Sequence, residues 1–148
     1  MSPPMRLYLV RHAQAEPSHP LGDSARRLTP EGRDAFRARA RALAPDVAFA
    51  RILSSPYARA RETAELLHAA TGAGVEIEEA LGSGRSEPQE LLRIARLRGD
   101  GTVLVGHNPE ISGAVAFVAG HELPVPPGTV ACLEVLDEAG WPRLAWLR

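Results

Sequence analysis

The sequence contains no lysine, so all 17 of its cationic side chains are arginine. A GC-rich genome is the simplest explanation of this bias, but the bias also means that any clamp for an anion must use arginine or histidine. The acidic residues number 18, and the formal net charge is −1. This nearly neutral balance gives no sign of binding to nucleic acid or to a membrane surface.

The sequence also lacks a second cysteine and any long apolar run. A disulfide within the chain is therefore impossible, and we expect Cys132, which lies in an apolar stretch, to be buried in the core. No run approaches the ~18 apolar residues of a membrane-spanning helix, and the first residues lack the apolar core of a signal peptide. We therefore expect a cytoplasmic protein.

The length and composition are those of one globular domain. The chain has 148 residues, of which 45% are apolar and 24% are charged, close to the averages for soluble proteins. It contains no internal repeat, low-complexity tract or linker that would divide it. The sequence thus predicts a single domain over residues 1–148.

Short apolar runs alternate with segments of helical periodicity. The runs predict strands at Leu7–Val10, Arg51–Ser54, Val75–Ile77, Thr102–Val105, Val130–Leu136 and Arg143–Leu147. The last two strands are expected to be joined by a turn around residues 137–140.

Capping residues mark where the helices between these strands begin. Thr29 followed by proline predicts one helix start, Ser55 followed by proline a second, and the spacing from Ser86 to Gln89 a third. A fourth helix is expected after Pro109 and ends at Gly120. Alternating strands and helices predict a three-layer α/β/α sandwich with a mostly parallel sheet and an antiparallel edge.

Cationic and imidazole side chains follow three of the predicted strands. Arg11 and His12 end the first, His107 ends another, and Arg59 lies in the first turn of the helix after Ser55. Ligands of open α/β sheets bind beyond the carboxyl ends of the parallel strands. Each residue alone would be read as part of a surface loop or helix, but two arginines and two histidines at one edge favour a site for a dianion such as a phosphoryl group.

Four segments around these residues resemble motifs of one family. Residues 9–13 read LVRHA, residues 28–32 LTPEG, residues 54–64 SSPYARARETA and residues 105–107 VGH. In this order they resemble the LxRHG, LTxxG and SPxxRAxxTA motifs and the second histidine motif of the histidine phosphatase superfamily.

The resemblance covers the chain from about Leu7 to Leu136 and implies a phosphoglycerate mutase-like fold. It also implies a phosphatase in which His12 is the nucleophile that carries the phosphoryl group. Arg11, Arg59 and His107 would bind the phosphate, and no metal or other cofactor would be needed. The short chain is most similar to phosphohistidine phosphatases of the SixA type, which carry an aspartate at the position of Asp23.

Two positions depart from the family pattern. Ala13 replaces the usual glycine, which is tolerable unless the backbone needs a positive φ there. No segment matches the motif of the glutamate that protonates the leaving group in many members. Glu79 is a weak candidate for that acid, Asp23 the best candidate for a proton-handling role at the mouth of the site, and Ser18 stands where some members place a phosphate-binding asparagine.

The weak acid motif bears on the substrate. An alkoxide leaving group needs a proton, whereas the imidazole that leaves from phosphohistidine is less demanding. The sequence therefore favours phosphohistidine in a protein over a small phosphomonoester. That small phosphorylated metabolite stays open as an alternative substrate, as does a module that binds a phospholigand without turnover.

A metal enzyme is disfavoured, because no two of the histidines have the spacing of paired metal ligands. The five are His12, His19, His68, His107 and His121. The sequence leaves the oligomeric state open.

Overall fold

The computed structural model of the chain describes residues 4–136 and 140–148, and its centre is a six-stranded sheet. The strands are β1 (Met5–Arg11), β2 (Arg51–Ser54), β3 (Gly74–Ile77), β4 (Thr102–Gly106), β5 (Val130–Val135) and β6 (Arg143–Leu147). They lie in the order β3-β2-β4-β1-β5-β6. The runs predicted as strands are confirmed, with ends that shift by one or two residues.

The sheet is parallel on one side and antiparallel on the other. Strands β3, β2, β4 and β1 run parallel, β5 pairs antiparallel with β1, and β6 pairs antiparallel with β5. The sequence expectation of a mostly parallel sheet with an antiparallel edge is therefore confirmed. As a result, β1, β2 and β4 all end at the same edge.

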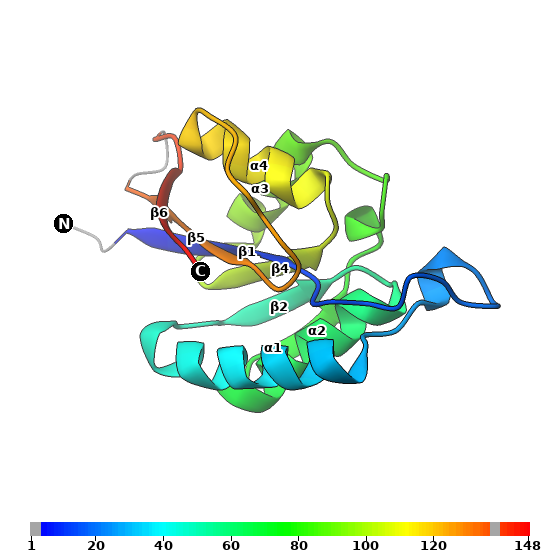
Figure 1. Cartoon of the computed structure of the whole chain (residues 1–148). Helices are drawn as coiled ribbons and strands as arrows, with labels where there is room; N and C mark the ends of the chain where they lie inside the picture. The colour runs from blue at the N-terminus through cyan, green and yellow to red at the C-terminus, as the bar shows by residue number, and fades with distance from the viewer. Residues whose placement is uncertain (1–3, 137–139) are drawn as a thin grey trace.

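Helices cover both faces of the sheet (Figure 1). On one face lie α1 (Pro30–Leu43) and α2 (Ala58–Thr71), and on the other α3 (Pro88–Arg98) and α4 (Glu110–Ala119). Short 3-10 turns occur at Asp23–Ala25, Ala44–Asp46 and Glu79–Leu81.

Alternate residues of the central strand face opposite helix layers. Tyr8 and Val10 belong to the core under α1 and α2, whereas Leu7 and Leu9 belong to the core under α3 and α4. All four are at most 1% exposed, which is why β1 reads as an unbroken apolar run. The arrangement is the expected three-layer sandwich. Cys132 is buried in the first of these cores, as expected.

The helix starts are only partly as expected. Thr29 caps α1, since its side chain accepts a hydrogen bond from the Gly32 amide at 2.9 Å. The predicted cap at Ser55 is wrong, because α2 begins at Ala58 and Ser55 bonds elsewhere. The predicted capping box is wrong as well: the Ser86 hydroxyl donates to the Ala80 carbonyl at 2.7 Å and does not cap α3.

Two further expectations from the sequence concern membrane-spanning helices and the turn between the last two strands. Within residues 4–136 and 140–148, none of the helices has the length and apolar character needed to cross a membrane. Of the turn expected around residues 137–140, residues 137–139 lie outside the part of the chain that the structure describes.

Candidate active site

A cleft of about 330 Å³ opens where β1, β2 and β4 end. The four residues singled out in the sequence line it together: Arg11 at the end of β1, His12 next to it, Arg59 in the first turn of α2, and His107 after β4. The register explains the meeting of the histidines, since β1 pairs with β4 up to Arg11 and the His12 amide donates to the Gly106 carbonyl at 3.0 Å. The two rings lie 5.3 Å apart between centroids.

His12 is held as a neutral imidazole with one free nitrogen. Its Nδ1 lies 2.7 Å from the Ala13 carbonyl, so Nδ1 carries the proton and Nε2 keeps its lone pair. The residue is only 8% exposed. Burial is the main cause that lowers the pKa of His12 to about 4, and the nearby Arg59 and Arg11 lower it further despite the bond to Ala13. At neutral pH, His12 therefore has the form that a nucleophile needs.

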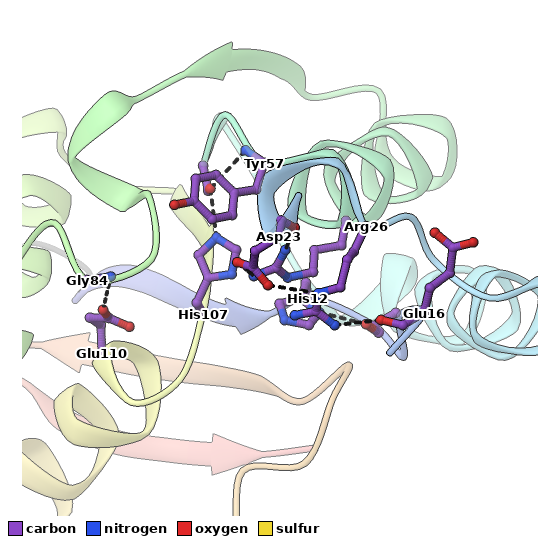
Figure 2. A network of polar contacts seen from close by, with 11 residues as sticks. His12, Glu16, Asp23, Arg26, Tyr57, Gly84, His107 and Glu110 are labelled. Carbon is purple, nitrogen blue, oxygen red and sulfur yellow. Dashed lines mark hydrogen bonds and ion pairs between the residues drawn. The ribbon is translucent and has the colours of Figure 1, made fainter. Parts of the chain in front are cut away.

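His107 is neutral as well, but its contacts assign it the opposite role. Its Nε2 lies 2.8 Å from the Ser55 hydroxyl, which already accepts a bond from the Tyr57 amide at 3.1 Å. The Ser55 hydroxyl can donate its proton to Nε2, and in that tautomer the Nδ1 of His107 is an N–H donor. Burial and the charge of Arg59 lower the pKa of His107 to about 3. Figure 2 shows the ring between Tyr57 and His12.

The two arginines are fixed by backbone carbonyls from distant segments. Arg11 Nη1 donates to the Val125 carbonyl at 2.9 Å, and Arg59 Nη1 donates to the Asp23 carbonyl at 2.7 Å. Arg59 is 3% exposed, and burial lowers its pKa. An arginine keeps its charge even when it is buried, so Arg59 places a cation in the lining of the cleft.

Three donors of these residues have nothing to bind within the described part of the chain. The Nε of Arg11, the Nε of Arg59 and the Nδ1 of His107 are buried without a hydrogen-bond partner. Buried donors are rarely left unsatisfied in native proteins. Three such donors around one cleft, two of them on cations, are suited to bind an oxyanion.

Asp23 closes the mouth of the cleft. Its Oδ2 pairs with Arg59 Nη2 at 3.1 Å. Its Oδ1 pairs with Arg26 Nε at 2.9 Å, and Figure 2 shows these two side chains together. Partial burial alone would raise the pKa of Asp23, but the bonds to Arg26 and Arg59 outweigh it and the pKa is lowered. The side chain, 60% exposed, is thus an ionised carboxylate.

The other two candidates from the sequence lie elsewhere. Ser18 and Glu79 are both exposed, and neither lines the cleft. Asp23 is the acidic residue among the residues that line it. In the described parts of the chain, no group of three or more histidine, cysteine, aspartate or glutamate side chains is arranged to hold a metal ion.

Sequence reasoning missed several residues of the site. Ser55 orients His107, Arg26 holds Asp23, and Ser83 and Asn108 line the cleft. Ser55 could have been found, because it directly follows β2 at the same sheet edge as His12. The proline after Ser55 favours the prediction of a helix cap and hides this role.

We expect acid to destabilise the empty protein through its two site histidines. Between pH 6.5 and about pH 4 the unfolded chain protonates both side chains, whereas the folded protein, with the pKa of His12 at about 4 and that of His107 at about 3, does not. The free energy of unfolding should therefore fall with decreasing pH by up to ~1.4 kcal/mol per pH unit for each histidine. Urea unfolding across this range measures the slope.

Matched variants identify the source of that slope. His12→Asn should remove part of it, whereas His121→Asn, at an exposed histidine outside the site, should leave it unchanged. An unaltered slope in His12→Asn would show that the site histidine does not resist protonation.

Comparison with known proteins places this chain among phosphatases. The sequence model of the histidine phosphatase superfamily (branch 1) matches residues 7–83, which include Arg11, His12 and Arg59. A search of curated proteins by sequence finds no match.

Solved structures resemble the whole chain. The protein assigned as phosphohistidine phosphatase SixA from Agrobacterium tumefaciens is 25% identical, with a TM-score of 0.85 over 99% of both chains. The protein histidine phosphatase SixA in complex with tungstate is 24% identical, with a TM-score of 0.82 over 97% of this chain and 96% of that one. Phosphoserine phosphatase from Entamoeba histolytica is 16% identical, with a TM-score of 0.72 over 97% and 96%. The last two show a common fold.

Proposed function

Because the chain belongs to the histidine phosphatase superfamily, we propose that it hydrolyses phosphohistidine in a protein, with His12 as the nucleophile. One observation carries the proposal. A neutral His12 with an unprotonated Nε2 lies beside three buried N–H donors that have no partner in the described residues. A nucleophile and an anion site in one cleft fit covalent phosphoryl transfer.

In the first step, His12 Nε2 attacks phosphorus in line with the bond to the leaving group. A P–N bond to His12 forms, and the electron pair of the bond that breaks goes to the substrate nitrogen. The substrate ring leaves as neutral imidazole because its other nitrogen carries a proton. Arg11, Arg59 and the Nδ1 of His107 donate to the three equatorial oxygens, so they supply the charge and the donors that stabilise a loose transition state.

In the second step, water attacks the phosphorus, and His12 Nε2 recovers its electron pair as phosphate is released. The ionised Asp23 is better suited to accept a proton from this water than to give one to a leaving group, because Arg26 and Arg59 lower its pKa. A cleft whose carboxylate is a base favours a substrate whose leaving group needs little acid. Phosphohistidine is such a substrate.

The resemblance of the full chain to a SixA protein supports this choice of substrate. A small phosphomonoester is the second candidate, since a cleft of about 330 Å³ is large enough to hold one. A module that only binds a phospholigand is disfavoured, because binding alone does not need the unprotonated Nε2 of His12.

The test compares kcat/KM on a phosphohistidine peptide with kcat/KM on phosphoserine and an aryl phosphate, all in the presence of EDTA. We expect activity to survive EDTA and the phosphohistidine peptide to be preferred by at least about tenfold, a difference of ~1.4 kcal/mol. Preference for an ester would refute the choice of substrate. Phosphate binding without release of product from any of the three would refute catalysis.

A further inference from the structure

A surface groove lies along the start of α2, beside the loop that carries Asp23. It consists of two cavities of about 520 and 430 Å³, whose linings share Arg27, Ala58 and Arg61. The first lies between the loop after β1, which includes Leu21, and the start of α2. The second continues toward β3, where Ile77 lines it.

The groove adjoins the active site. Tyr57 lines the first cavity, and its ring lies 4.9 Å from the ring of His107 between centroids. Ala25, also in that lining, lies in the chain between Asp23 and Arg26, which line the cleft. The two linings share no residue, so a bound chain whose phosphorylated residue enters the cleft would cross the turn at Asp23–Ala25 to reach the groove.

The shared wall of the two cavities carries two arginines, and the carboxylates of Glu62 and Glu65 also line the second cavity. Arg27 and Arg61 are exposed, and neither forms an ion pair within the described residues. By contrast, Arg33 in the second cavity pairs with Glu62 at 2.7 Å. Carboxylates in a bound chain would give Arg27 and Arg61 the partners they lack.

Apolar side chains lie exposed at both ends of this charged wall. Leu21 is 82% exposed and Ile77 is 49% exposed. A basic centre between two apolar ends is complementary to an acidic segment that also carries apolar side chains.

We propose that this groove binds the acidic segment of the substrate protein that flanks its phosphohistidine. The proposal rests on the proposed function, because it takes the substrate to be a phosphoprotein. Arg27 and Arg61 would bind carboxylates near the phosphorylated residue, and they would raise the specificity for a protein without touching the phosphoryl group.

The test uses two synthetic peptides that each carry one phosphohistidine, flanked by several glutamates in one and by glutamines in the other. Free phosphoramidate, which is too small to reach the groove, is the third substrate. The double variant Arg27→Glu/Arg61→Glu is compared with Arg41→Glu, which reverses an exposed arginine of α1 outside the groove lining.

We expect the native protein to prefer the glutamate peptide by at least about tenfold in kcat/KM, and added salt to reduce that preference. The double variant should lose the preference while its kcat/KM on phosphoramidate stays within about twofold, and Arg41→Glu should behave like the native protein. Equal turnover of both peptides by the native protein overturns the groove and leaves the proposed function intact. An equal loss on phosphoramidate overturns it too, because the variant would then act on the site itself.

Failure of the proposed function has a different signature. If aryl phosphate is hydrolysed and neither phosphohistidine peptide is, the unphosphorylated peptides are tested as inhibitors of aryl phosphate hydrolysis. A lower inhibition constant for the glutamate peptide, lost in the double variant, would still support the acidic occupant. Equal inhibition constants would refute it.

Discussion

Replacing His12 by alanine is expected to abolish phosphate release, with a fall in kcat of about 10⁴-fold or more. The covalent route needs a nucleophile, and His107 does not supply a second one. Its Nε2 is bonded to the Ser55 hydroxyl, and its Nδ1 is the N–H donor. Hydrolysis of an aryl phosphate measures the loss. The substitution also removes the packing of the ring and its hydrogen bond to the Ala13 carbonyl, so the folded state of the variant is checked by urea unfolding.

A second measurement makes this result specific to the covalent intermediate. Denaturing the native protein in alkali during turnover should trap a phosphoryl label that is stable in base and lost in acid, as expected for a P–N bond. His12→Ala should carry no label, whereas His121→Ala, at an exposed histidine outside the cleft, should be labelled normally. A label that persists in His12→Ala would assign the nucleophile to another residue.

The parts of the fold that could be predicted are those that local sequence determines. β1 and β4 are buried on both faces, so they read as short apolar runs, and the residues that follow them meet at one sheet edge. This rule alone places His12 near His107. The helix cap at Thr29 could also be predicted, since its hydroxyl accepts from an amide only three residues away.

The wrong predictions concern polar side chains that form a hydrogen bond with a distant residue rather than with a nearby backbone amide. Ser55 and Ser86 have the sequence context of helix caps, but Ser55 bonds to His107 and Ser86 to the Ala80 carbonyl. The Asp23–Arg59 pair joins residues 36 positions apart in the chain, and no local sequence pattern predicts it. Such hydrogen bonds depend on which residues the fold brings together, and helix propensity and residue spacing do not contain that information.

The alanine that replaces the family's glycine after His12 is explained by the backbone. Among the described residues, none other than glycine has a positive φ, so Ala13 sits in an ordinary conformation. Its carbonyl accepts from His12 Nδ1, and its amide donates to Thr63 Oγ1 at 3.0 Å. The feature needed at this position is therefore a well-held carbonyl, which alanine supplies as well as glycine does.

The second large effect is expected at Arg59, where substitution by alanine should lower kcat/KM by about 10³-fold. Arg59 supplies an N–H donor and a buried charge to the phosphoryl oxygens, and no other cation is as deeply buried in the lining of the cleft. Its loss should also raise the pKa of His12, because burial and then the charge of Arg59 hold that pKa at about 4. The acid limb of the profile of kcat/KM against pH should then move to higher pH.

The conservative variant separates these two contributions of Arg59. Arg59→Lys keeps the charge, so the acid limb should return toward that of the native protein. A lysine ammonium cannot reproduce the planar fork that holds Asp23 and leaves Nε for the substrate, so the maximal kcat/KM should stay at least about tenfold low. Full recovery of kcat/KM in Arg59→Lys would mean that charge alone suffices, and an acid limb unmoved in Arg59→Ala would mean that burial alone keeps His12 neutral.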